Sequence, residues 1–432
     1  MSPKSRGRKP SRKPAQRRGN PRPAVPATQA AEVLRDARVL LGGIDVLEAE
    51  LWASAWLGQV WTDDYPMDDL KEESGHLTTC EVILALEVIG RACDHPSPHG
   101  RAAVAALGRL AAAPQEVLAA ALARLSSQVP PGWETDQGWQ PVSASQAVSV
   151  WGDLRVLMVE FTGPVPHVLV ATLLEVGGTV VTELAISPPR ARQQFEQHLP
   201  VLGQEPMTLQ EVRPEQVLAD LADALRRVDQ RWPRPEESSV VDLRAVAWQR
   251  AAAYLPELRS RATLGAEEEA ALLDAFLAGV WPGHEPDPDP YLDPAIDRGV
   301  ARSLAQIFLD FGQHCLPHPL AWSPLGVDLL LAAVLPADQC LDQPQRDALE
   351  SVLGGWIVFA LHQRGLASSP TEQAVAAVTL SLPAFLANID DPTQWSLVKR
   401  LRVRLEEQGI DLTDPEAVGR QLLSALGAPE DD

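Results

Sequence analysis

Apolar residues recur at three- and four-residue steps along most of the chain, the spacing that predicts amphipathic helices. Between residues 29 and 131 this pattern is interrupted at Gly42 and Gly43, and it indicates a small helical bundle. The same spacing returns after residue 240, where it predicts a helical pair over 240–280 and a C-terminal helical domain over 295–428. The individual helices expected there cover residues 240–255, 266–280, 295–312, 324–335, 343–364, 371–388, 394–408 and 414–426.

The middle of the chain follows a different pattern, with apolar runs of strand length that are rich in β-branched residues. Three such runs cover residues 154–161, 167–176 and 179–186, and residues 207–212 are a candidate fourth. Gly177 and Gly178 suit a two-residue hairpin turn, because both glycines readily adopt positive φ. Amphipathic stretches at 188–199 and 214–228 predict two helices that pack on the sheet.

These patterns together predict a predominantly α fold with a central α+β module over residues 145–235, which contains a three- to four-stranded antiparallel meander plus helices. Residues 281–294 alternate prolines with acids, a composition that favours an extended linker. Residues 1–28 are rich in Pro, Arg and Ser and have almost nothing to bury, so we expect a disordered basic tail.

Charge is distributed very unevenly along the chain. The whole chain has 37 cations, 58 acids and a net charge of −21. Residues 1–23 contain no acid, so the remainder is the more strongly acidic part and should attract cations or basic partners. The cations of the tail are Lys4, Arg6, Arg8, Lys9, Arg12, Lys13, Arg17, Arg18 and Arg22.

The basic tail has three interpretations. Clustered cations on a flexible segment can neutralise phosphates, which gives salt-sensitive nucleic-acid binding without sequence preference. No aromatic residue interrupts these cations, so bases would have nothing to stack on. Alternatively, the tail only solubilises the chain, or it binds the protein's own acidic surface.

One cluster of residues has the donor types of a zinc site. Cys93, His95 and His99 follow one another closely, and His76 and Cys80 precede them. Against a metal, Cys80 lies in an apolar helical stretch, where a small buried thiol is ordinary, and the spacing matches no zinc module. A second and less specific candidate group contains His314, Cys315, His318 and Cys340.

Trp52, Trp56 and Trp61 fall on one predicted helix at spacings of four and five residues. Large aromatic residues at helical spacing usually contribute to a core, and that is our interpretation of these three. Tryptophan is also enriched where proteins bind partners, so a docking surface is the alternative.

Catalytic signatures are absent from the sequence. The glycine pairs at 42–43, 177–178 and 354–355 are not followed by Lys and Ser or Thr, so none is a phosphate loop. There is no Gly-x-Ser-x-Gly elbow and no His-Glu-x-x-His helix. We therefore name no catalytic residue, and the sequence leaves any cofactor unknown, since it implies none. Four cysteines in a chain of 432 residues indicate reduced thiols and a cytoplasmic protein, and no apolar run approaches the length of a membrane span.

The run Pro-Leu-Ala-Trp-Ser-Pro at residues 319–324 is followed by an apolar stretch at 327–331 and by a helix that contains Trp356. These features resemble the C-terminal part of uncharacterised helical proteins from high-GC bacteria. The likeness covers about a quarter of the chain, and it implies a helical C-terminal domain without implying an activity.

The function that the sequence favours is that of a soluble, non-enzymatic binding or adaptor protein with a protein partner. One alternative is a nucleic-acid-associated protein that uses the basic tail. The other is a metal-dependent enzyme, or a protein with a structural metal, that uses Cys93, His95 and His99.

Overall fold

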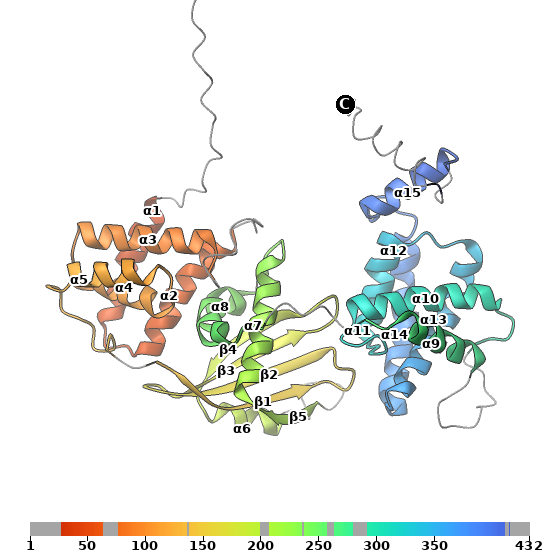
Figure 1. Ribbon diagram of the computed structural model, residues 1–432, viewed down its shortest axis with the longest axis horizontal. Coiled ribbons are helices and arrows are strands. Elements are labelled where there is room, and N and C mark those ends of the chain that lie inside the picture. The colour runs from red at the N-terminus through yellow and green to blue at the C-terminus, as the bar shows by residue number, and fades with distance from the viewer. Residues whose placement is uncertain are drawn as a thin grey trace, which may run out of the picture. The chain divides into compact units, whose positions relative to one another are not determined.

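The computed structural model describes residues 27–63, 77–135, 138–198, 207–235, 237–256, 263–279, 292–410 and 414. The chain divides into two compact units, residues 1–135 and residues 136–432. Helices dominate both, and the second contains one antiparallel sheet (Figure 1). The predicted fold class, predominantly α with a central α+β module, is confirmed.

The first unit is a bundle of short helices. Asp45 and Glu48 start α2 with a capping box, in which each side chain accepts a hydrogen bond from the other residue's backbone N–H at 2.9 and 3.0 Å. The glycine pair does break the helical pattern, since Gly43 has a φ of +80°. The elements are α1 (Ala27–Asp36), the 3-10 helix η1 (Ala37–Leu41), α2 (Val46–Trp61), α3 (Thr79–Asp94), α4 (Pro98–Arg109) and α5 (Gln115–Arg124).

The bundle closes around a core that is mostly aliphatic, with Trp61 fully buried in it. One charged pair is also inside. Glu50 is fully buried, and its Oε1 accepts a 2.7 Å hydrogen bond from Nε of Arg109. A buried carboxylate needs such a partner, because an unpaired charge away from water is costly.

The sheet of the second unit has five antiparallel strands in the order β4-β3-β2-β1-β5. The predicted meander of three to four strands is therefore present, with one strand more. That strand is β1, which pairs with β2 on one side and with β5 on the other. The strands are β1 (Gln140–Val148), β2 (Leu154–Thr162), β3 (His167–Leu174), β4 (Val180–Ser187) and β5 (Thr208–Val212).

Helices cover both faces of this sheet to different extents. α7 (Pro214–Gln230) and α8 (Ser238–Ala251) lie along one face, where α7 buries an apolar stripe that includes Leu221 and Leu225 (Figure 1). On the other face, Val156, Met158 and Val168 form a small cluster with residues that include Phe195 of α6 (Ala191–His198). The module is thus a sheet packed between one long helical layer and one short helix.

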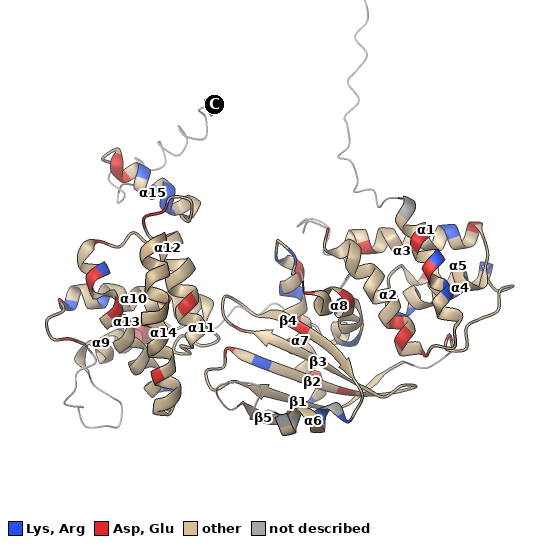
Figure 2. Ribbon diagram, turned by 180° about the vertical axis from the view of Figure 1, so that it is seen from behind, with Lys and Arg blue, Asp and Glu red and all other residues tan. Residues whose placement is uncertain are grey.

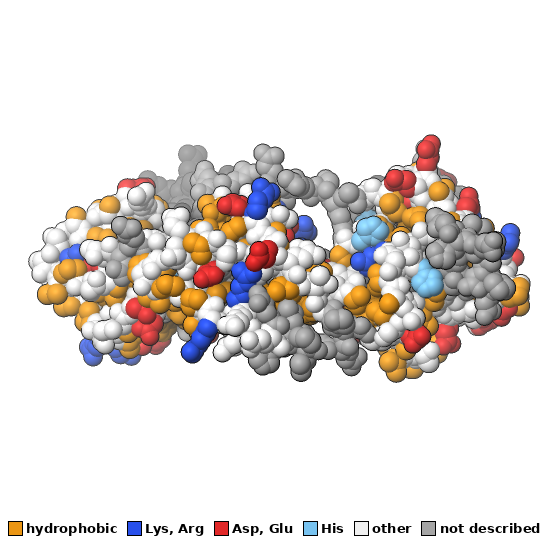
Figure 3. Space-filling view, turned by 90° about the horizontal axis from the view of Figure 1, so that it is seen from below, with side chains coloured by type: hydrophobic (Ala, Val, Ile, Leu, Met, Phe, Trp, Pro, Cys, Tyr) orange, Lys and Arg blue, Asp and Glu red, His pale blue; other side chains and the backbone are white. Residues whose placement is uncertain are grey.

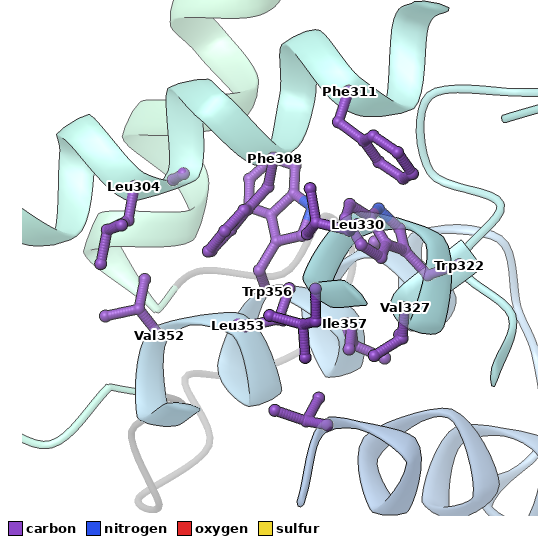
Figure 4. Packing of buried hydrophobic residues seen from close by; sticks show 14 of the residues in the cluster. Leu304, Phe308, Phe311, Trp322, Val327, Leu330, Val352, Leu353, Trp356 and Ile357 are labelled. Carbon is purple, nitrogen blue, oxygen red and sulfur yellow. The ribbon is translucent and has the colours of Figure 1, made fainter. Parts of the chain in front are cut away.

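The C-terminal helices of the second unit enclose an aromatic core (Figure 4). Trp356 packs edge to face on Phe276, with 5.2 Å between the ring centroids, and the rings of Trp322 and Phe311 have their centroids 5.5 Å apart. The elements are α9 (Ala266–Ala278), α10 (Arg298–Cys315), α11 (Pro324–Leu329), the π-helix η5 (Leu330–Val334), α12 (Leu335–Asp338), α13 (Gln343–Gln363), α14 (Ser368–Asn388) and α15 (Leu397–Glu407).

The Pro-Leu-Ala-Trp-Ser-Pro run has a structural explanation within this core. Trp322 is fully buried, and the Oγ of Ser323 accepts a 3.1 Å hydrogen bond from the N–H of Gly326 to start α11. Pro324 then occupies the first turn of the helix, where its missing N–H costs nothing.

Two hydrogen bonds connect backbone groups of the sheet to these helices. The N–H of Gly177 donates to the carbonyl of Cys315 at 2.7 Å, and Nη1 of Arg364 donates to the carbonyl of Trp151 at 2.9 Å. Two hairpin turns of the sheet therefore contact the helical part directly. Most of the predicted linker at 281–294 and the predicted helix at 414–426 lie outside the described residues.

Candidate functional site

The residues of the predicted metal cluster occupy different environments. Cys80 and Cys93 are buried thiols near the two ends of α3. His95 is exposed at the C-terminal end of that helix. His99 lies in the first turn of α4, with Nε2 3.2 Å from Oγ of Ser97. His76 is outside the described residues.

Within the described ranges, no three or more His, Cys, Asp and Glu side chains converge as metal ligands. Cys80, Cys93, His95 and His99 are therefore not brought together as such a group, and neither are His314, Cys315, His318 and Cys340. Burial lowers the pKa of His99, and the charge of Arg38 lowers it further. The nine cations of the basic tail all lie outside the described residues.

Ionised groups do converge where the sheet meets α7. Arg155 of β2 lies 3.3 Å from Oε1 of Glu175 and also pairs with Asp220 of α7. Oε2 of Glu175 accepts a 2.6 Å hydrogen bond from the hydroxyl of Thr179. The cluster has the character of a structural ion-pair network that fixes α7 on the sheet, and within it Oε1 of Glu175 and Nε of Arg155 are buried without a hydrogen-bond partner.

The feature that distinguishes the second unit is the outer surface of α14. From 373 to 389 the sequence contains no charged residue. The inner side is buried, as Ala374, Val378 and Phe385 show, and α14 packs on α11 and α13. The outer positions, which we name the α14 face, are the exposed residues Ala376, Thr379, Leu380, Pro383, Leu386 and Ala387.

The α14 face is unusually apolar for an exposed surface. Leu380 is 80% exposed and Leu386 is 60% exposed. A helix that is apolar all round is normally buried all round, whereas only one side of α14 is covered. No described helix, α14 included, is long and apolar enough to cross a membrane. By comparison, Figure 3 shows a face of the molecule on which hydrophobic side chains are interspersed with polar and charged ones, as is ordinary.

The next helix, α15, has a different character, since it is basic and amphipathic. Lys399, Arg400, Arg402 and Arg404 lie within eleven residues (Figure 2). Residues 263–432 as a whole contain 26 acids and nine cations, so almost half of the cations of this region are in α15.

Lys399 attaches α15 to the helices before it. Its side chain is only 3% exposed, and Nζ donates to the carbonyls of Pro336 at 2.7 Å and Ile389 at 3.1 Å. These carbonyls belong to the C-terminal ends of α12 and α14, where a positive charge is favourable. Nζ also lies 5.0 Å from the ring of Trp395. Burial nevertheless lowers the pKa of Lys399.

Sequence reasoning did not identify α14 or α15 as a functional surface. The signals were present in the sequence, as an uncharged stretch at 373–389 and as four cations at 399–404. What the sequence did not reveal is which side of α14 the rest of the domain covers.

Comparisons with known proteins add no functional information. No protein-family model matches the chain, no curated protein matches it, and no solved structure matches it.

Proposed function

We propose that this chain is a non-enzymatic binding or adaptor protein whose C-terminal helices dock a protein partner on the α14 face. One observation carries the proposal: α14 is apolar on both sides, and its outer side has Leu380 and Leu386 largely exposed. Exposed apolar surface of this kind is typical of protein interaction sites.

Hydrophobic burial would supply the binding energy. Covering an exposed leucine side chain completely contributes about 1.5–3 kcal/mol. The small residues Ala376 and Ala387 on the same face would allow a partner helix to approach closely. The matching partner surface is therefore a mainly apolar segment, which must leave room for the hydroxyl of Thr379 and for Glu350, whose Oε1 accepts a 3.1 Å hydrogen bond from it.

The test uses full-length protein with Leu380→Gln and Leu386→Gln together. The control is Val129→Gln, which changes an equally exposed apolar residue (72% exposed) in the first unit. Proteins recovered from native lysate are compared after circular dichroism has shown equal helix content. We expect the unaltered chain and V129Q to recover the same partner protein. The double variant should fail to recover it. Equal recovery by all three proteins would contradict the proposal, as would a protein that recovers nothing and stays monomeric.

The second candidate function is non-specific contact with nucleic acid through the basic tail. Nine cations without an acid in residues 1–23 of an otherwise acidic chain favour it. The experiment compares DNA and RNA retention by the full chain and by a chain that begins at Gln29, across a salt series. Equal retention by both chains at every salt concentration would exclude a nucleic-acid role for the tail.

A metal-dependent role through His76, Cys80, Cys93, His95 and His99 is less favoured, because the four described members do not converge. Metal content of the purified protein, with Cys93→Ala and His99→Ala as controls, tests it directly. Cytoplasmic location and likeness to helical proteins of high-GC bacteria remain proposals that rest on cysteine content and on residues 319–324, respectively.

A further inference from the structure

We infer that the partner segment that docks on the α14 face is a basic amphipathic helix, with lysine or arginine on both sides of its apolar stripe. The inference rests on the proposed function and adds the chemistry of the partner to it. Two exposed acids carry the argument, because each forms a hydrogen bond with α14 from a neighbouring helix.

These two acids, Asp328 of α11 and Glu350 of α13, lie on opposite sides of α14. The hydroxyl of Ser381 donates a 2.9 Å hydrogen bond to Oδ1 of Asp328, and the hydroxyl of Thr379 donates a 3.1 Å hydrogen bond to Oε1 of Glu350. Residues two apart on a helix point about 200° away from each other, so the two carboxylates approach α14 from opposite sides. Both acids are exposed. A helix that lies along the α14 face therefore has a carboxylate on either side of it.

The ends of α14 also carry acids. Glu372 is exposed in the first turn, and Asp390 follows the last turn. Nη1 and Nη2 of Arg346 each lie 2.8 Å from one carboxylate oxygen of Asp390, so a cation balances the charge of this acid. Glu372 thus joins Asp328 and Glu350 as an exposed acid around the two leucines of the α14 face.

Cations are scarce in the same helices. Residues 324–390 contain seven acids and two cations, Arg346 and Arg364. Arg346 pairs with the acid that follows α14, and Nη1 of Arg364 donates to a backbone carbonyl of the sheet at 2.9 Å. The electrostatic potential over the α14 face is therefore negative, which attracts a cationic partner and repels an anionic one.

The dimensions of the α14 face suit a helix. From Ala376 to Ala387 it extends for about 17 Å, so a partner helix of about four turns covers it. Lysine and arginine place long apolar stems beside such a stripe and extend their charges to its edges, where the acids lie. The negative potential disfavours anionic lipid and nucleic acid, and the net charge of −21 disfavours a second copy of the chain.

The experiment measures, by fluorescence anisotropy, the binding of labelled peptides of about 18 residues to the full-length chain. The first peptide contains only leucine and lysine, in an order that gives its helix one apolar stripe flanked by lysines. The second has glutamate in place of every lysine. The third has the composition of the first in an order without a stripe, and it reports non-specific attraction between a cationic peptide and an acidic protein.

Two paired substitutions separate the flanking acids from the rest of the acidic surface. Asp328→Asn with Glu350→Gln removes both flanking charges and keeps the oxygen atoms that accept the two hydrogen bonds from α14. The matched control, Glu267→Gln with Asp310→Asn, removes two exposed charges from α9 and α10 instead. Circular dichroism first shows that all variants have the helix content of the unaltered chain.

We expect the leucine–lysine peptide to bind the unaltered chain and the control pair equally. It should bind the chain without the flanking charges about three- to tenfold more weakly, since exposed ion pairs contribute modestly to binding. Equal affinity for the leucine–lysine peptide and either of the other two peptides would overturn the inference. So would equal weakening by the two paired substitutions, because the attraction would then come from the acidic surface as a whole.

Leu380→Gln with Leu386→Gln distinguishes failure of this inference from failure of the proposed function. If these substitutions abolish binding of the leucine–lysine and leucine–glutamate peptides alike, the basic partner is excluded and the proposed function stands. If they weaken the binding of no peptide, both fail. Concentration-dependent dimers of the unaltered chain that these substitutions abolish would also overturn the inference, because a second copy would then occupy the α14 face.

Discussion

The indole Nε1 of Trp52 donates a 2.7 Å hydrogen bond to Oδ2 of Asp36, and the indole of Trp56 donates to the same oxygen at 3.0 Å. One carboxylate thus joins the end of α1 to two successive turns of α2. Of the three tryptophans that we interpreted as core, only Trp61 is fully buried. The other two are half-buried and are held by this shared acceptor.

We predict that Asp36→Ala destabilises the first unit by about 1–3 kcal/mol, because hydrogen bonds to a charged acceptor contribute about that amount. Urea unfolding followed by tryptophan fluorescence measures the change. Asp94→Ala is the control, since the Asp94 side chain is 71% exposed and lies 3.7 Å from Arg124. An equal loss of stability in the two variants would show that the indole contacts contribute nothing specific.

Two helical glycines should respond in opposite ways to alanine. A Cβ on Gly312 of α10 would lie 2.3 Å from the carbonyl oxygen of Pro319, which belongs to the backbone and cannot rotate away. A Cβ on Gly354 of α13 would have Cγ1 of Val375 as its nearest neighbour, at 4.0 Å. We expect Gly312→Ala to destabilise the second unit by about 1–3 kcal/mol. Gly354→Ala should stabilise it by about 0.5–1 kcal/mol, since alanine favours a helix.

Thermal unfolding of both variants provides the measurement. A melting temperature for G312A at or above that of the unaltered chain would contradict the close approach of α10 to residue 319.

The buried Lys399 should make stability depend on alkaline pH. Its lowered pKa means that the folded chain releases this proton at a lower pH than the unfolded chain does. The unfolded state therefore binds more protons between the folded pKa and the ordinary value of 10.5, so the free energy of unfolding rises with pH in that interval. Lys399→Met should abolish this rise, and Arg400→Met should preserve it.

Denaturant unfolding at several pH values between 8 and 11 tests this prediction. If K399M and R400M show the same pH dependence, Lys399 is not the group responsible. At neutral pH we also expect K399M to be less stable than R400M, because the carbonyls of Pro336 and Ile389 lose their charged donor.

His318 should make the free energy of unfolding depend on pH on the acid side of neutrality. Burial lowers its pKa from 6.5, and the positive charge of Arg364 lowers it further. Its Nδ1 also accepts a 3.1 Å hydrogen bond from the N–H of Leu320, which protonation of that nitrogen would break. Below pH 6.5 the unfolded chain takes up a proton that the folded chain does not, so stability falls as pH decreases.

We expect His318→Gln to lose less stability than the unaltered chain between pH 7 and pH 5. The measurement is the denaturation midpoint at each pH, with His314→Gln as the comparison. An identical acid response of H318Q and the unaltered chain would contradict the assignment.

Many of the helices were predictable because the sequence contains two signals for them. One is the spacing of apolar residues, and the other is a capping residue at the helix start. Ser323 and Pro324 begin α11, and Asp342 begins α13 by accepting a hydrogen bond from the N–H of Gln345. Strand β1 was not predicted, because its sequence is polar and has few β-branched residues. It is a strand through its two neighbours, β2 and β5, so pairing in the folded sheet outweighs weak local preference.

The candidate site was less predictable than the fold. The uncharged stretch at 373–389 was visible, but whether its outer side is covered depends on helices far away in the sequence. The metal hypothesis depended on proximity in sequence, whereas Cys93 faces the interior of the bundle and His95 is exposed beyond the end of the same helix. Proximity along a helix end does not aim side chains at one point.

The two contacts between hairpin turns and C-terminal helices determine how this chain can be dissected. The N–H of Gly177 and the carbonyl of Trp151 each form a hydrogen bond with a residue of the helical part. A cut between the α+β module and those helices would leave these groups without their partners and uncover Trp151, which is 9% exposed. Truncated proteins for crystallisation or for partner mapping should therefore begin at residue 136 and retain the sheet and the helices together.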